Sequence, residues 1–169
     1  MKRRAFTLIE LLVSITILSI IMVFLYKTYD MINRSNTIIK NQSEKIIDIQ
    51  KIKKVIYMDF LLAQKKSIHI KNIEKGKDFV TMQSSNSIHQ RYNPYITYIL
   101  KEDKLYRLES LEAIKEYNIE ANAQFDIDKI GDVTTFKVYK STIKDENSYL
   151  INIIFKNLDE ILLKVKSLN

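Results

Sequence analysis

The spacing of apolar positions changes twice along the chain. From Phe6 to Tyr26 they form an almost unbroken run, FTLIELLVSITILSIIMVFLY, in which Glu10 is the one ionisable side chain. Beyond Tyr26 they recur every three or four residues, which predicts an amphipathic helix. No Gly or Pro lies between Phe6 and Ala63, so we expect one continuous helix that ends near Ala63 to Lys66. The apolar positions of its outer part are Met31, Ile32, Ile38, Ile39, Ile46, Ile49, Ile52, Val55 and Ile56.

From Phe79 onward the apolar period shifts toward two, which indicates strands. Charged turns at Lys101–Lys104 and Lys144–Asn147 predict two hairpins. The expected fold class is α+β: a long N-terminal helix whose second half packs on a mainly antiparallel β-sheet. The candidate strands are Phe79–Gln83, Tyr95–Leu100, Leu105–Glu109, Gln124–Asp128, Thr135–Ser141, Tyr149–Phe155 and Ile161–Val165.

The N-terminal run has the length of a membrane-spanning helix, since about 20 residues at roughly 1.5 Å each cover about 30 Å of hydrocarbon. Lys2, Arg3 and Arg4 precede it, and such a basic flank stays in the cytoplasm. A secretory signal peptide fits less well, because the run is long and has no small-residue exit. A plain single-pass anchor leaves Glu10 unexplained, because an acid in hydrocarbon costs about 2.5–3.5 kcal/mol. Glu10 therefore either has a functional partner or lies near enough to the interface to be hydrated or protonated.

Composition narrows the functional classes. The formal net charge of +7 comes from 27 Lys and Arg against 20 Asp and Glu. Three of the excess positive charges belong to the basic flank and the others are spread along the chain, so nucleic-acid binding by this chain is not favoured. The absence of cysteine excludes disulfides and thiolate metal sites. Two glycines are too few for a glycine-rich phosphate loop.

The titratable side chains of the polar part lack the spacing of a catalytic or metal site. His69 and His89 are far apart and form no HExxH pattern. Asp126, Asp128 and Asp132 lack the order and closing Glu of an EF-hand loop. We expect surface roles for the two histidines and for Asp126 and Asp128, and no enzymatic activity, cofactor or metal. Cross-strand packing is favoured over a ligand-stacking face for the tyrosines Tyr92, Tyr95, Tyr98 and Tyr106.

The segment KRRAFTLIELLV, residues 2–13, closely resembles the start of a type IV prepilin. It combines a very short basic leader, a small residue, an aromatic residue and a Thr-Leu-Ile-Glu string that opens an apolar run. The resemblance implies a leader at residues 1–5, a transmembrane and assembly helix at 6–26, its amphipathic continuation at 27–66 and a β-rich periplasmic domain at 67–169.

The family pattern also implies residue roles. A prepilin peptidase would cut between Ala5 and Phe6 and methylate the new amine of Phe6. The Glu10 carboxylate would then meet the amine of a neighbouring Phe6 as helices stack in a filament. Ala5 departs from the pattern, because the family usually has Gly there, and the extra methyl group predicts slower cleavage. Retention of Glu10 disfavours the pseudopilin type at the very tip, which usually lacks that acid.

A second resemblance concerns the polar domain. Asp59-Phe60, the strand YITYIL (residues 95–100) and the strand KLYRL (104–108) are similar to the J-type minor pseudopilins and related minor pilins. We therefore expect a minor subunit that helps initiate or cap a type IV pilus-like or type II secretion filament. Its expected partners are the peptidase, other pilins, the inner membrane and assembly platform proteins. The alternative is a single-pass anchored, extracytoplasmic binding or sensor module.

Overall fold

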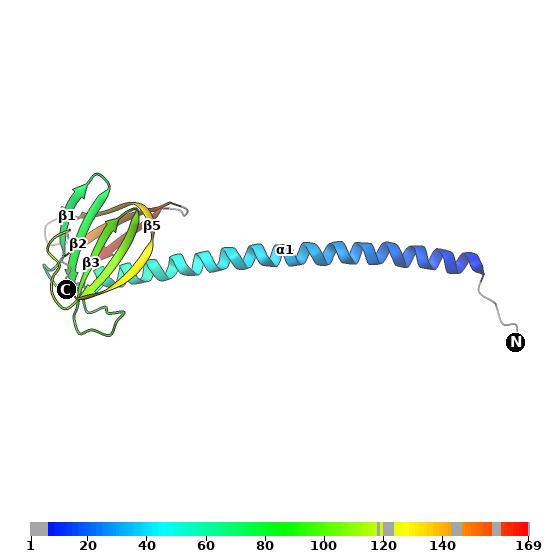
Figure 1. Ribbon diagram of the computed structural model, residues 1–169, viewed down its shortest axis with the longest axis horizontal. Coiled ribbons are helices and arrows are strands. Elements are labelled where there is room, and N and C mark those ends of the chain that lie inside the picture. Colours follow the sequence, from blue (N-terminus) through cyan, green and yellow to red (C-terminus); the bar gives the residue numbers. More distant parts are fainter. Residues whose placement is uncertain (1–6, 118, 120–123, 143–146, 157–159, 169) are drawn as a thin grey trace. The chain divides into compact units, whose positions relative to one another are not determined.

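The computed structural model describes residues 7–117, 119, 124–142, 147–156 and 160–168. It begins with one continuous helix, α1 (Leu8–Leu61), as the sequence predicts (Figure 1). The helix ends just before the predicted range of Ala63 to Lys66. Backbone bonds from Gln64 N to Gln83 O (2.8 Å) and from Ser85 N to Leu62 O (3.3 Å) draw the chain into contact with the sheet. These long-range bonds end the helix where no Gly or Pro marks a stop.

The chain divides into two compact units, Met1–Ile49 and Gln50–Asn169. In the first unit the side chains of residues 7–48 are all exposed. The apolar part of α1 is long and hydrophobic enough to cross a membrane. A helix that buries none of this surface within its own chain requires another apolar environment.

The second unit is built on a seven-stranded sheet with the strands in sequence order. Each strand pairs antiparallel with the next. The expected α+β class, with a long N-terminal helix and a mainly antiparallel sheet, is confirmed. The strands are β1 (His69–Glu74), β2 (Lys77–Gln83), β3 (Tyr95–Lys101), β4 (Lys104–Ser110), β5 (Phe125–Lys140), β6 (Ser148–Phe155) and β7 (Ile161–Lys166).

The β3–β4 hairpin has the predicted tight turn. Lys101 pairs with Lys104, and the two residues between them, Glu102 and Asp103, have φ of 51° and 56°. Two consecutive positive φ values match the twist of the flanking strands. The second predicted hairpin also exists as the antiparallel β5–β6 pair, although its tip at residues 143–146 lies outside the described residues.

Two strands that the sequence predicts separately are one strand in the structure. The segments Gln124–Asp128 and Thr135–Ser141 belong to one strand, β5, whose first part pairs with β4 and whose second part pairs with β6. The register shifts opposite Leu105 and Tyr106, and this irregularity hides the strand's continuity from a period-two pattern. Strand β1 was missed, because its side chains are almost all exposed and no alternation marks it.

The main core lies between the end of α1 and one face of the sheet. Ile56 and Phe60 are fully buried. The Phe60 ring centroid lies 6.4 Å from that of Tyr98 and 5.9 Å from that of Tyr149. Packing of α1 on the sheet is therefore confined to its last turns.

A smaller core covers the opposite sheet face. Its buried members are Phe79, Ile99 and Leu108. Side chains of the segment after β4, including Ile114 and Tyr117, pack against them. Both faces of the β2–β4 region are thus covered, and the segment after β4 forms part of that cover.

Candidate functional site

The first candidate site is the start of α1. Thr7 directly precedes the helix, and Glu10 lies in its first turn. The Thr7 backbone N–H and the Thr7 hydroxyl each donate to Glu10 Oε2 at 2.9 Å. Glu10 N in turn donates to Thr7 Oγ1 at 3.4 Å. This reciprocal arrangement is a capping box, which satisfies amide groups that a helix start otherwise leaves without partners.

The capping box gives the Glu10 carboxylate a partner within its own chain. Its charge also lies near the positive end of the helix dipole. Sequence reasoning looked for this partner in another subunit and missed Thr7. The Thr-x-x-Glu spacing at residues 7–10 is the signal that identifies a capping box.

Other polar side chains of the apolar segment are bonded within the helix. The hydroxyl of Ser14 donates to the carbonyl of Glu10 at 2.7 Å. The hydroxyl of Thr16 donates to the carbonyl of Val13, and that of Ser19 to the carbonyl of Ile15, each at 2.8 Å. Such internal bonds make hydroxyl groups tolerable in hydrocarbon. Glu10 remains the one ionisable group of the apolar run. The predicted processing residues Ala5 and Phe6, and the basic residues Lys2, Arg3 and Arg4, lie outside the described residues.

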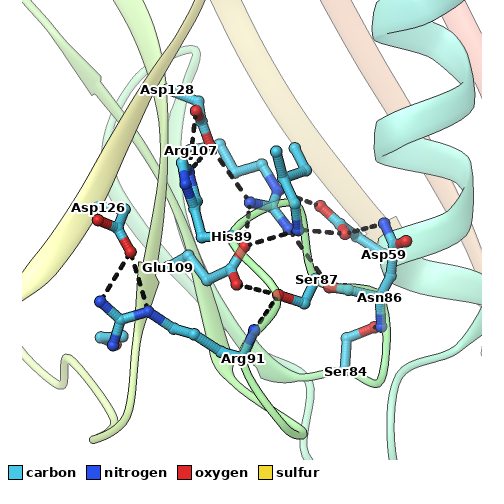
Figure 2. Close-up of polar contacts among 12 residues, drawn as sticks. Asp59, Ser84, Asn86, Ser87, His89, Arg91, Arg107, Glu109, Asp126 and Asp128 are labelled. Atoms are coloured by element: carbon cyan, nitrogen blue, oxygen red, sulfur yellow. Dashed lines mark hydrogen bonds and ion pairs between the residues drawn. The ribbon is translucent and has the colours of Figure 1, made fainter.

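The second candidate site is a cluster of buried charges centred on Arg107 of β4 (Figure 2). Arg107 Nε donates to Asp59 Oδ2 at 2.8 Å, and Arg107 Nη2 donates to Asp59 Oδ1 at 3.2 Å. Arg107 Nη1 donates to Glu109 Oε2 at 2.8 Å. The side chains of all three residues have no solvent exposure. A two-pronged contact of this kind needs the planar guanidinium group.

Asp59 joins α1 to this cluster. Its carboxylate also accepts bonds from the Tyr98 hydroxyl at 2.5 Å and from Asn86 Nδ2 at 2.7 Å. Burial alone would lower the pKa of Arg107, but the hydrogen bonds and charge of Asp59 raise it above its usual value. Arg107 is therefore charged at every physiological pH. Burial raises the pKa of Asp59, and the charge of Arg107 and these hydrogen-bond donors offset part of that effect.

Glu109 connects the cluster to the β2–β3 loop, residues 84–94. Ile88 N donates to Glu109 Oε2 at 3.0 Å, and the Ser87 hydroxyl makes a short hydrogen bond to Glu109 Oε1. Although burial alone would raise the pKa of Glu109, hydrogen bonds from Ser87 and Arg107 hold it below its usual value. The loop is fixed further out by a hydrogen bond between His89 Nε2 and Asp128 Oδ2 (3.0 Å) and by an ion pair from Arg91 to Asp126 (2.7 Å).

The cluster ties four elements together and does not resemble a catalytic centre. It links the end of α1, the β2–β3 loop and strands β4 and β5 through charge-assisted bonds. Over the described parts of the chain, no three His, Asp or Glu side chains are placed to hold a metal ion. The predicted surface role of His69 and His89 agrees with their exposure. Asp126 and Asp128 are only partly exposed and form ion pairs with Arg91 and Arg107. Asp132 pairs separately with Lys129 at 2.9 Å.

The four tyrosines do not form one ligand-stacking face. Tyr98 is fully buried, and its ring centroid lies 5.7 Å from that of Phe136, so it packs across strands as predicted. Tyr92 is 90% exposed on the β2–β3 loop. Tyr95 and Tyr106 lie on the sheet face opposite Tyr98, because Tyr106 pairs with Ile99 and side chains alternate along a strand.

One comparison with known proteins identifies the N-terminal segment. Residues 1–26 match the family model of the prokaryotic N-terminal methylation motif. This motif is typical of type IV prepilin-like proteins, whose family is structural rather than enzymatic. The resemblance of the first residues to a prepilin is therefore confirmed. No curated protein matches the chain.

Proposed function

We propose that this chain is a minor pilin or pseudopilin, a non-enzymatic subunit that helps initiate or cap a type IV pilus-like or type II secretion filament. One observation carries the proposal: the methylation motif at residues 1–26 coincides with the membrane-compatible part of α1. A precursor that is stored before assembly has two requirements. It needs a motif that a processing enzyme recognises and a helix that is stable in a bilayer.

The proposal assigns a role to each part of the chain. Residues 1–5 form the cytoplasmic leader, and residues 6–26 cross the inner membrane once. Residues 27–66 contain the rest of the helix, which ends at Leu61, and residues 67–169 form the periplasmic domain. The boundaries of these segments are based on the basic flank and on the change in the spacing of apolar residues. The partners are a prepilin peptidase, other pilins and assembly platform proteins.

Assembly would exchange one set of contacts for another at Glu10. In the single chain, the capping box with Thr7 satisfies part of the carboxylate's hydrogen-bonding capacity. Cleavage between Ala5 and Phe6 would create an amine, methylated but still charged, at Phe6. In the apolar core of a filament, that amine and the Glu10 carboxylate of another subunit each cost free energy alone and compensate each other as a pair. The pair would fix the axial register of the subunits.

Processing is tested by coexpression with and without a prepilin peptidase, followed by intact-mass measurement of the membrane-extracted chain. The expected change is loss of residues 1–5 and gain of one methyl group. An Ala5→Gly variant serves as the matched comparison, and we expect it to be processed faster because the small residue before the cut is then less crowded. An unprocessed chain in both cases would contradict the proposal.

The role of Glu10 separates assembly from the anchored sensor alternative. We expect Glu10→Ala to abolish co-purification with partner pilins while leaving the chain in the membrane fraction. Ser14→Ala is the matched control, because it removes a polar group from the same helix one turn away and leaves Glu10 in place. Unchanged co-purification of Glu10→Ala would favour an anchored binding module in which Glu10 has no assembly role.

A further inference from the structure

A pocket of about 460 Å³ lies on the sheet face opposite α1. Its floor is formed by alternate residues of β1, β2 and β3, among them Lys71, Phe79, Thr81 and Tyr95. The residues between them on β2, Val80 and Met82, belong to the core on the other face. The volume falls within the range of pockets that hold small organic molecules.

The wall of the pocket is the segment 113–115, which hydrogen bonds hold against the sheet. Lys71 Nζ donates to the Lys115 carbonyl at 2.8 Å, and the buried Thr81 hydroxyl donates to the Ile114 carbonyl at 3.0 Å. A little further along, the Tyr117 hydroxyl donates to the Leu100 carbonyl at 2.8 Å. The pocket is therefore formed in the absence of a ligand, which lowers the entropic cost of binding.

The lining combines apolar surface with positive charge. Tyr95 and Ile114 supply apolar area, whereas His69, Lys71 and Lys115 supply basic groups. None of the described residues that line the pocket carries a carboxylate. The bond from Lys71 uses one of three ammonium protons, and a neutral carbonyl oxygen does not neutralise the charge of the ammonium group. Such a lining favours a negative charge at the rim and an apolar group over the floor.

We propose that this pocket binds an organic carboxylate whose body is aromatic or aliphatic. Lys71 and Lys115 would hold the carboxylate, and the apolar group would lie against Tyr95 and Ile114. An inorganic anion fits the basic groups but leaves the apolar floor uncovered. Two sources share the required chemistry: a small free acid, and the C-terminal residue of a peptide. The proposal is independent of the assembly role of the N-terminal helix.

The test is isothermal titration calorimetry on the full chain in lipid nanodiscs, with empty nanodiscs as the blank. The ligands are 3-phenylpropionate, the dipeptide N-acetyl-Gly-Phe with a free carboxylate, the same dipeptide as its C-terminal amide, and inorganic phosphate. We expect at least one of the two carboxylates to bind. The amide and phosphate should bind at least tenfold more weakly than that carboxylate. Tighter binding of the dipeptide would identify a peptide end as the source, and tighter binding of 3-phenylpropionate a small acid.

Three variants localise the binding. Lys115→Gln removes a rim charge but keeps the carbonyl that Lys71 contacts, and we expect about a tenfold loss of affinity. Lys164→Gln is the matched control, because Lys164 is also exposed but lies on β7 away from the pocket, and we expect no loss. Ala113→Phe should fill the pocket and abolish binding with an unchanged melting temperature. Equal affinity for acid and amide, no binding of either acid, or equal loss in the two lysine variants would overturn the proposal.

Discussion

Arg107 is the residue on which the cluster of buried charges depends. Its guanidinium group contacts carboxylates of Asp59, Glu109 and Asp128 at 2.8, 2.8 and 3.3 Å. Removing one partner of a buried ion pair leaves the other charge uncompensated, at a cost of about 3–5 kcal/mol. We expect Arg107→Met to lower the free energy of unfolding of the unit Gln50–Asn169 by about that amount. The measurement is chemical denaturation of the full chain, followed by the near-ultraviolet circular dichroism of its buried tyrosines.

Arg107→Lys is the informative comparison, because it keeps the charge. A single ammonium group lacks the planar fork that reaches Asp59 and Glu109 together, so a loss of about 1.5–3 kcal/mol is expected. The double variant Arg107→Met with Asp59→Leu should lose less than the sum of the two single losses, because neither buried charge of that pair remains. Strict additivity would mean that the pair contributes nothing as a unit.

Glu109 makes the stability of the folded chain depend on pH in the acidic range. Its pKa is lowered in the folded chain from an ordinary value of 4.5, because hydrogen bonds from Ser87 and Arg107 to the carboxylate outweigh burial. A group with a depressed folded pKa contributes stability above its unfolded pKa, and that contribution disappears as pH falls through the folded pKa. We expect the melting temperature to fall below about pH 4.5, and Glu109→Gln to show a shallower fall over the same range. A parallel fall in both proteins would assign the acid sensitivity to other carboxylates.

At the scale of elements, strand β5 depends on one glycine. A Cβ atom at Gly131 would lie 2.8 Å from Phe155 Cε1 and 3.2 Å from Phe155 Cδ1, on the neighbouring strand β6. The Phe155 side chain is 5% exposed, so the ring has little room to move. We expect Gly131→Ala to cost about 1–3 kcal/mol, measured by thermal denaturation. Adding Phe155→Leu to Gly131→Ala should recover part of that loss, and no recovery would show that the backbone at Gly131 is the cause.

The same elements show which features can be inferred from the amino-acid sequence. Helix α1 and strands β2, β3, β4, β6 and β7 follow from local apolar period and turn chemistry, and Glu10 stands out because it interrupts an apolar run. The buried cluster is different, because Asp59, Arg107 and Glu109 belong to segments far apart in the chain and look like surface residues in a local window. They are buried because Arg107 of β4 forms ion pairs with Asp59 of α1 and with Glu109, and no local sequence pattern contains this information. The continuity of β5 and the existence of β1 likewise depend on neighbouring strands.

At the scale of the whole chain, the two units have different sources of stability. The side chains of residues 7–48 are exposed, so no tertiary packing within the chain stabilises this part of α1. The unit Gln50–Asn169 has its own core, with Phe60, Tyr98 and Tyr149 in contact across it. Elements that share few packed side chains unfold with separate free energies. We therefore expect the full chain in a bilayer to unfold in two thermal transitions.

Circular dichroism separates these two transitions in the chain reconstituted in lipid nanodiscs. The near-ultraviolet signal of buried tyrosines, Tyr98 among them, should disappear at the lower temperature, while much of the far-ultraviolet helix signal persists. The reason is that every backbone amide of a helix in hydrocarbon must stay bonded within the helix. Arg107→Met should shift the tyrosine transition downward and leave the helix transition in place. Coincident transitions that move together in Arg107→Met would instead show that the two units unfold as one cooperative structure.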